Sequence, residues 1–224
     1  WVRARTGHEH EPASFTFKAG DALYRAFECR TVDTLLAFGN NGRVYSVPVA
    51  GLPGARGDGQ PVLTLIELEA GTQLLHYFAG PSQAQLLLSG SGGYGFIAQV
   101  GDMISRQRGG KAFITCNARE TVCAPSYIGG TSGSVPVPEA THIASASAGG
   151  RLLTFPIGEL RTMPNGGRGL MLMSLEDKDV LIGAAAYTRS IRVQGTGRGG
   201  KPREETLEIR SLNNAAAARG RKGK

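Results

Sequence analysis

The sequence has little cysteine, few aromatic residues and no long apolar run. Its 3 cysteines, Cys29, Cys116 and Cys123, form no CxxC pair and have no histidine at zinc-ligand spacing, which predicts small core or surface residues in a reducing compartment. No run approaches the roughly 20 apolar residues of a membrane-spanning helix, and Trp1–Arg5 is not followed by the apolar segment of a signal peptide. We therefore expect a cytoplasmic protein. Because the chain does not start with methionine, we expect it to begin inside a longer one.

Glycine is abundant, and this excludes a long-helix or coiled-coil protein. The 224 residues include 33 glycines and 11 prolines. A glycine in a helix interior costs about 1 kcal/mol relative to alanine, so the composition favours short strands joined by tight turns. The length is sufficient for one large domain or two small ones with a core.

Acidic residues are scarce at the end of the chain. The formal net charge is +7, and residues 1–186 carry equal numbers of basic and acidic groups. Residues 187–224 contain ten basic and three acidic residues, and no acidic residue follows Glu208. Such a basic end favours a polyanionic partner, nucleic acid first and an anionic membrane surface second. The alternative is a solvated basic tail without a partner.

Three segments of the sequence align with one another without gaps. They read GRVYSVPVAGL at 42–52, GYGFIAQVGDM at 93–103 and GRLLTFPIGEL at 150–160. Each follows an apolar run and a turn of small residues, a pattern that predicts a β-hairpin. The period is roughly 50 residues, and four-stranded repeats of this length are typical of propeller-like architectures.

A glycine-rich basic turn and another strand-like run follow each hairpin. The turns lie at 55–59, 106–111 and 165–169. The runs are Val62–Leu68, Ala112–Cys116 and Leu170–Leu175. Less regular strand-like pieces occur near the two ends, at Trp1–Ala4, Leu23–Phe27, Ser190–Gln194 and Glu205–Leu212. No long helix is expected, and Ala215–Ala218 forms at most one short helical turn.

We therefore predict an all-β fold, a propeller-like disc of four-stranded blades. About five blades are expected within one domain, 1–224, and the first and last are incomplete. The approximate blades are 1–33, 34–83, 84–138, 139–186 and 187–224. Because one such unit cannot bury both of its faces, the units must pack around a shared axis.

Two glycine motifs resemble nucleotide-binding loops but lack the required context. Gly90–Gly95 fits GxGxxG, yet a strand pattern follows where a dinucleotide site needs a helix. Gly195–Lys201 fits GxxxxGK, but Pro202 stands where a P-loop needs serine or threonine. Both motifs are interpreted as turns.

Histidine offers no clear catalytic set. His8 and His10 flank Glu9 in a loop, so the sequence does not exclude a surface metal site there. His76 and His142 are isolated. No nucleophile, base and acid occur together in a recognisable pattern. We therefore expect no catalytic residue, no metal site and no cofactor here, although distant loops could still assemble a site.

The turn at 106–111 carries three cations and two glycines without an acidic residue. Phosphate binding needs cations on a backbone that approaches closely, and glycine permits both the turn and exposed N–H groups. A ring of such turns suits a bent duplex recognised by its shape. The candidate DNA-binding residues are Arg106, Gln107, Arg108, Gly109, Gly110 and Lys111, with support from Arg56, Arg168, Arg198, Lys201, Arg219, Arg221 and Lys222. The alternative for the isolated cations Arg56 and Arg168 is a solvated turn, and for 219–224 a frayed tail.

Gln107–Lys111 reads QRGGK and resembles the gyrase-A box of bacterial type IIA topoisomerases, Q-R-R-G-G-K-G, with one arginine missing and Ala112 in place of the last glycine. The whole chain is similar to the C-terminal DNA-binding domain of the A subunit of DNA topoisomerase IV. The similarity runs from WVRARTGHE and FKAGDALYRAF, through GRVYSVPVAGLPGARGDGQPV and SGGYGF, to GGRLLTFPIGEL and RGRKGK. It implies a β-pinwheel whose blades exchange their outer strand with a neighbour.

The resemblance also implies a role. The domain would bind and bend double-stranded DNA for a type II topoisomerase that decatenates and relaxes DNA, without being catalytic itself. The implied partners are the N-terminal cleavage core of the same chain and the topoisomerase IV B subunit in a heterotetramer, with peripheral membrane association of the holoenzyme. ATP and Mg²⁺ would act in other domains and subunits, and the location would be the bacterial cytoplasm at the nucleoid. One alternative is the DNA-wrapping domain of the gyrase A subunit, although no box here is intact. Another is a propeller-like protein-interaction scaffold with a basic tail.

Overall fold

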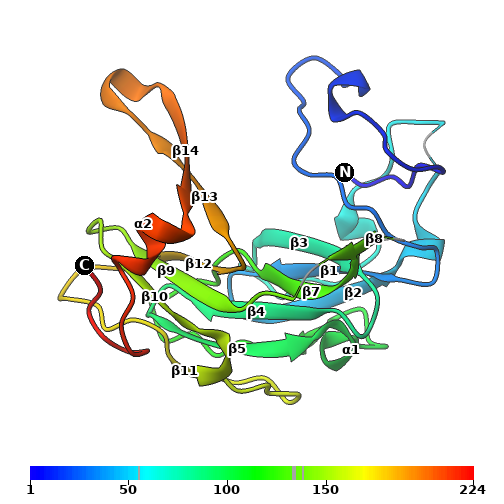
Figure 1. Ribbon diagram of the computed structural model, residues 1–224. Coiled ribbons are helices and arrows are strands. Elements are labelled where there is room, and N and C mark those ends of the chain that lie inside the picture. The colour runs from blue at the N-terminus through cyan, green and yellow to red at the C-terminus, as the bar shows by residue number, and fades with distance from the viewer. Residues whose placement is uncertain (55, 133–134, 138) are drawn as a thin grey trace.

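Three β-sheets of short strands dominate the structure, a computed structural model (Figure 1). It describes residues 1–54, 56–132, 135–137 and 139–224, and the side chains of 130–132, 135–137 and Arg198 are not described. Ala55 of the first basic turn therefore lies outside the described residues. The sheets have the strand orders β3-β1-β2-β6, β11-β5-β4-β7-β8 and β10-β9-β12, and β13-β14 forms a separate pair.

The strands are short, and the helices between them span at most five residues. The strands are β1 (Thr34–Gly39), β2 (Arg43–Pro48), β3 (Leu74–Gly80), β4 (Gln85–Gly90), β5 (Tyr94–Gln99), β6 (Lys111–Ala112), β7 (Ser126–Ser132), β8 (Val135–Val137), β9 (His142–Ser147), β10 (Leu152–Pro156), β11 (Leu170–Met171), β12 (Leu181–Tyr187), β13 (Ser190–Thr196) and β14 (Pro202–Glu208). The helical turns are η1 (Pro12–Ser14), η2 (Val49–Gly51), η3 (Val62–Thr64), α1 (Val100–Met103), η4 (Ile157–Glu159), η5 (Arg198–Gly200) and α2 (Ile209–Asn213). Among the described residues, no helix is long and apolar enough to cross a membrane.

The three predicted hairpins are confirmed. β1 pairs with β2, β4 with β5, and β9 with β10, all antiparallel. A further strand, β3, β7 or β12, pairs with the first strand of each hairpin and extends the sheet on that side. Each of the three repeats thus forms the body of one blade.

Neighbouring blades exchange strands at their outer edges. β6, which follows the second hairpin, pairs with β2 of the first blade, and β11, which follows the third hairpin, pairs with β5 of the second. At the end of the chain, Leu152 in β10 and Lys224 exchange two backbone hydrogen bonds of 2.8 and 3.0 Å. The predicted exchange of outer strands is therefore confirmed.

The core lies between adjacent blades. One cluster joins Leu36 and Phe38 of the first blade to Leu86 and Phe96 of the second, with Phe113 between them. A second cluster packs Leu87 of the second blade against residues of the third. A third cluster, which includes Tyr45, Val47 and Ile66, lies within the first blade and packs against the N-terminal segment at Val2 and Phe27. The blades therefore bury their faces against neighbouring blades or against the N-terminal segment.

Strand pairing near the two ends of the chain is less regular than in the three blades. At the N-terminus, Val2 pairs with Gln60 and Ala4 with Gly54 as isolated bridges. At the C-terminus, β13 and β14 form a two-stranded hairpin that projects from the sheets (Figure 1). The approximate blade spans given above remain a prediction.

Several predicted strands are wrong or shorter than expected. Val62–Leu68 is not a strand, because Pro61 introduces the 3₁₀ turn η3, with Thr64 N–H donating to the Pro61 carbonyl. Leu23–Phe27 pairs with no strand in the described part of the chain and instead contacts β3 through its aromatic rings, such as Tyr24 edge-on to Tyr77 with ring centres 5.4 Å apart. The predicted strand Glu205–Leu212 ends at Glu208, where α2 begins.

Candidate nucleic-acid interface

The basic turns at 55–59, 106–111 and 165–169 and the basic end segment 219–224 each contain a glycine that docks on the preceding blade. At these four positions the backbone has a positive φ, and a Cβ atom would lie against a carbonyl oxygen of the strand alongside. The glycines and the residues whose carbonyls they approach are Gly59 at Val2, Gly110 at Val44, Gly169 at Gly95 and Gly223 at Leu152. The four turns therefore occupy equivalent places at the junctions between consecutive blades.

The turn at 106–111 presents its first two side chains to solvent. Arg106 and Gln107 are exposed, and among the described residues Arg106 forms no ion pair or side-chain hydrogen bond. Arg108 donates to the Thr64 carbonyl at 2.8 Å and lies 3.8 Å from the Glu67 carboxylate, with 57% of its side chain exposed. Lys111 lies 5.1 Å from the centre of the Phe113 ring. The turn is thus anchored through its backbone and Arg108, while Arg106 stays exposed and Lys111 is half-buried.

Arg43 holds this turn in place from the neighbouring blade. Its guanidinium donates to the carbonyls of Gly109 at 3.1 Å and Gly110 at 3.2 Å and pairs with Glu69 at 3.0 Å. Sequence reasoning did not single out Arg43. The available signal was its place after the first glycine of a repeat, which Arg151 shares.

Arg151 of the third blade contacts the basic end segment as Arg43 contacts the turn at 106–111. It pairs with Glu176 at 2.7 Å and lies 3.5 Å from the Gly223 carbonyl. Lys222 lies 3.7 Å from the same carboxylate, and Arg221 is exposed. The basic end of the chain is therefore docked rather than frayed.

Arg219 is committed to backbone contacts in this end segment. Its guanidinium donates to the Met171 carbonyl at 2.7 Å and the Glu159 carbonyl at 3.2 Å. These bonds hold the segment against β11 and η4, so a DNA contact by Arg219 would compete with them.

Among the described residues of the second blade, no arginine holds the docked turn. Instead, the turn's own cation, Arg168, is paired with an acidic residue. Arg168 forms two hydrogen bonds with Glu120, of 2.8 and 2.9 Å, and stacks over Tyr94 with its guanidinium carbon 4.2 Å from the ring centre. Tyr94 stands at the position of Arg43 and Arg151 in the other repeats. The Arg168 charge is thus already matched by an acid, and its predicted DNA contact remains a prediction.

This pair gives a prediction about stability and pH. Hydrogen bonding from Arg168 holds the pKa of Glu120 below its ordinary value of 4.5. A lowered carboxyl pKa stabilises the fold above pH 4.5 and loses that effect as pH falls through the folded-state value. We expect Glu120→Gln to lower the free energy of unfolding by about 1 to 2 kcal/mol at pH 7 and by much less at pH 3, measured by urea denaturation.

The matched control is Asp177→Asn, at an exposed carboxylate with no hydrogen bond or ion pair among the described residues. It should leave stability unchanged at both pH values. An equal loss for Glu120→Gln at pH 3 and pH 7 would show that the pair is not the cause.

The first turn adds two cations that sequence reasoning missed. Arg56 lines a polar hollow of about 330 Å³ together with Arg3 and Lys18. Arg3 donates to the Gly57 carbonyl at 3.1 Å, and Lys18 pairs with Asp58 at 2.6 Å. The backbone pairing of Val2 with Gln60 brings these distant segments together, which no local motif reveals.

The remaining candidates lie on the projecting hairpin. Lys201 is exposed next to η5, between β13 and β14. The backbone of Arg198 belongs to η5, and its side chain is outside the described part of the chain.

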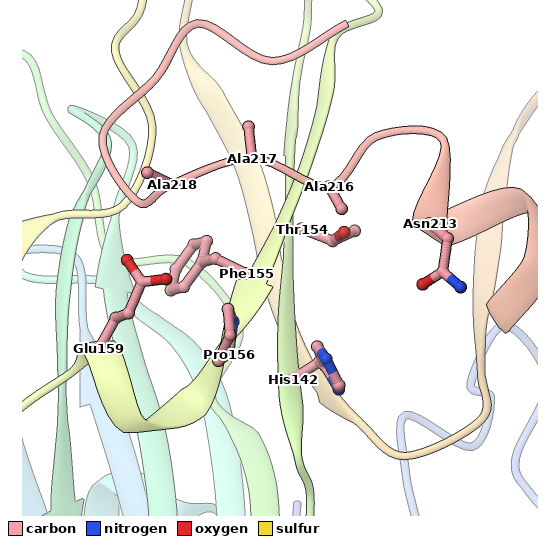
Figure 2. Close-up of a pocket in the computed structure, with 9 residues that line it drawn as sticks. All are labelled: His142, Thr154, Phe155, Pro156, Glu159, Asn213, Ala216, Ala217 and Ala218. Atoms are coloured by element: carbon pink, nitrogen blue, oxygen red, sulfur yellow. The ribbon is translucent and has the colours of Figure 1, made fainter.

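A pocket of about 470 Å³ lies between β10 and the segment after α2 (Figure 2). Its titratable side chains do not form an acid–base pair. The Nδ1 atom of His142 lies 2.8 Å from the Thr141 hydroxyl, and the Glu159 carboxylate accepts the backbone N–H of Arg219 at 3.0 Å. Phe155 and Pro156 are placed between the two groups (Figure 2).

The cysteines are poor nucleophiles at neutral pH. Burial raises the pKa of Cys123 to about 11, and burial also raises the pKa of Cys29 and Cys116. A thiol must be deprotonated to attack an electrophile, so the raised pKa values disfavour the reactive thiolate near pH 7. Within the described residues, no group of three or more His, Cys, Asp or Glu side chains is placed to hold a metal ion.

Comparison with known proteins relates this architecture to bacterial topoisomerases. The family model described as "DNA gyrase C-terminal domain, beta-propeller" matches residues 33–68 and 141–187. The A subunit of DNA topoisomerase 4 from Neisseria gonorrhoeae is 36% identical over 228 aligned positions, covering 100% of this chain and 28% of the relative. The corresponding protein of Escherichia coli K12 is 27% identical, covering 100% of this chain and 29% of the relative. The chain thus spans less than a third of the length of these curated relatives.

Solved structures agree with this comparison. The structure of the E. coli ParC C-terminal domain superposes with a TM-score of 0.81 and 26% identity, covering 100% of this chain and 89% of that one. The structure of the DNA gyrase A C-terminal domain gives a TM-score of 0.66 and 18% identity, covering 99% of this chain and 68% of that one, which shows a shared fold.

Proposed function

We propose that this chain binds and bends double-stranded DNA. It belongs to the family of C-terminal domains of DNA topoisomerase IV A subunits and has the gyrase A C-terminal domain as a relative. In this role it presents a bent DNA segment to the cleavage core of a type II topoisomerase, for decatenation and for relaxation of supercoils. The domain itself is non-catalytic. ATP and Mg²⁺ act elsewhere in the enzyme.

The observation that carries this proposal is the recurrence of basic turns at equivalent blade junctions. Arg106, Arg108 and Lys111 occupy one junction, and Arg56, Arg221 and Lys222 lie at two others. Cations at successive junctions match the repeated phosphates of a duplex that curves along the blades. Such contacts carry no base information, so preference among sequences comes from the ease of bending.

The proposed partners follow from the family. They are the N-terminal cleavage core of the same polypeptide and the B subunit in a heterotetramer, at the nucleoid in the bacterial cytoplasm. Peripheral membrane association of the holoenzyme is part of the same proposal, since the cationic turns also suit an anionic surface.

Ligation of a nicked circular plasmid with increasing amounts of this chain tests the function. We expect a gel shift at moderate salt and little change in linking number, because bending without chiral wrapping stores no net twist or writhe of one sign. A large linking-number change of one sign would instead indicate the wrapping activity of a gyrase-type domain. The absence of a gel shift would contradict DNA binding and favour a protein-interaction scaffold.

A further inference from the structure

The hairpin β13–β14 is an arm that the blades do not need for their own packing. Its seven residue pairs run from Ser190 opposite Glu208 to Thr196 opposite Pro202. Every side chain of β13 and β14 in the described part is exposed except those of Ile191 and Leu207, which are half-buried at the base. An isolated two-stranded hairpin is marginally stable in water, so a projecting arm of this length is best explained by something that it contacts.

Four of the five charged side chains of the stem are paired with one another, and only Glu208 has no ion pair among the described residues. Arg192 pairs with Glu204 at 3.1 Å, and Arg203 pairs with Glu205 at 3.0 Å. Gln194 also donates to Glu204 at 2.8 Å. The stem therefore offers little net charge to a partner.

The tip of the arm, Gly197–Lys201, has the opposite character. It contains three glycines and two cations and no acidic residue. Gly199 and Gly200 have φ values of +76° and +75°, so the chain turns there with almost no side-chain bulk. The Lys201 side chain is exposed and forms no ion pair among the described residues. Positive charge is thus concentrated at the end of a stem that has two basic and three acidic residues and carries no positive net charge.

We propose that this tip enters the major groove of the DNA held by the basic turns. The inference rests on the proposed DNA-binding function and adds a groove contact to its phosphate contacts. Seven residues of strand extend about 23 Å, more than the roughly 8.5 Å depth of the groove. A two-stranded ribbon fits the major groove, roughly 12 Å wide, but not the minor groove, roughly 6 Å wide.

Other occupants fit the arm less well. The tip has no apolar side chain in its described part, so it lacks the anchor that a membrane-inserting loop needs. The strand edges carry paired charges, which oppose the addition of a peptide strand. A thin, glycine-rich and cationic tip matches a groove walled by phosphates.

Methylation of a bound duplex by dimethyl sulfate tests the proposal, because guanine N7 lies in the major groove and adenine N3 in the minor groove. We expect this chain to protect guanine N7 at one short patch. A variant in which Asn-Gly replaces Arg198–Gly200 and alanine replaces Lys201 keeps the pair formed by Gly197 and residue 201, where the Gly197 N–H donates to the carbonyl of residue 201 at 2.8 Å, and should lose that protection. Lys201→Ala should weaken it, with a salt slope lower by about 1.

The matched control is Arg210→Ala, which removes one exposed cation at α2, at the base of the same arm. It should retain the N7 protection. If the Asn-Gly variant binds DNA and protects N7 as the unmodified chain does, or if only adenine N3 is protected, the groove contact is overturned while the proposed function stands. If no variant and no unmodified chain shifts DNA in a gel, both fail.

Discussion

Replacing Arg106, Arg108 and Lys111 together by alanine is expected to weaken binding to a random duplex by about 10- to 100-fold. The reason is the release of counterions, since each phosphate contact adds about 1 to the magnitude of the slope of log affinity against log salt. The triple variant should therefore have a slope smaller in magnitude by about 3. The three cations lie in one turn, where Arg106 and Arg108 are exposed and Lys111 is half-buried, and Arg106 has no competing partner among the described residues. Affinity measured from 50 to 200 mM salt by fluorescence anisotropy gives both quantities.

Gln107→Ala is the matched control for this triple variant, because it alters an exposed side chain of the same turn without changing charge. It should leave the salt slope unchanged. A triple variant that binds as tightly as the unmodified chain, with the same slope, would contradict the placement of the DNA at this turn.

Gly110→Ala is expected to lower the free energy of unfolding by about 2 to 4 kcal/mol, or the melting temperature by about 5 to 15 °C. Gly110 has a φ of +60°, and a Cβ atom would lie 2.5 Å from the Val44 carbonyl oxygen and 2.9 Å from the Tyr45 ring. Neither neighbour can move freely, since Val44 and Tyr45 are buried. The substitution should therefore detach β6 from β2.

Gly109→Ala tests the same prediction one residue earlier. Apart from its two chain neighbours, no atom of the described residues lies within 4 Å of a Cβ at Gly109, and its φ is not positive. This variant should change stability by less than about 0.5 kcal/mol. If thermal unfolding showed the same loss of stability for both alanine variants, the contact of Gly110 with Val44 and Tyr45 would not be the cause.

The hairpins were predictable because their signals are local. In Thr34–Pro48, all three parts of the hairpin pattern lie within 15 residues: an apolar run, a turn of small residues and a second apolar run. The exchanged strands β6 and β11 are only two residues long, and their partners are more than 60 residues away. The sequence near Lys111 carries no information about this pairing beyond the glycine before it.

The candidate site was predictable in its turns but not in its charges. The cations at 106–111 could be read from the sequence, whereas the pairing of Arg168 with Glu120 depends on segments 48 residues apart. In the same way Arg3 and Lys18 reach Arg56 only through the N-terminal bridge. Contacts between segments that are distant in the sequence determine which basic side chains are paired with acidic ones. The spacing of residues in the sequence does not predict these contacts.

The exchange of outer strands has a consequence for how the domain is made. The first blade lacks its edge until Lys111 emerges from the ribosome, the second until Leu170, and the third until Lys224. Each nascent blade therefore waits with an open edge for about 30 to 70 further residues, which at roughly 5 to 20 residues per second is several seconds. Native topology is thereby acquired in a fixed N-to-C sequence. Slow codons after each hairpin would prolong the time in which unpaired edges can aggregate.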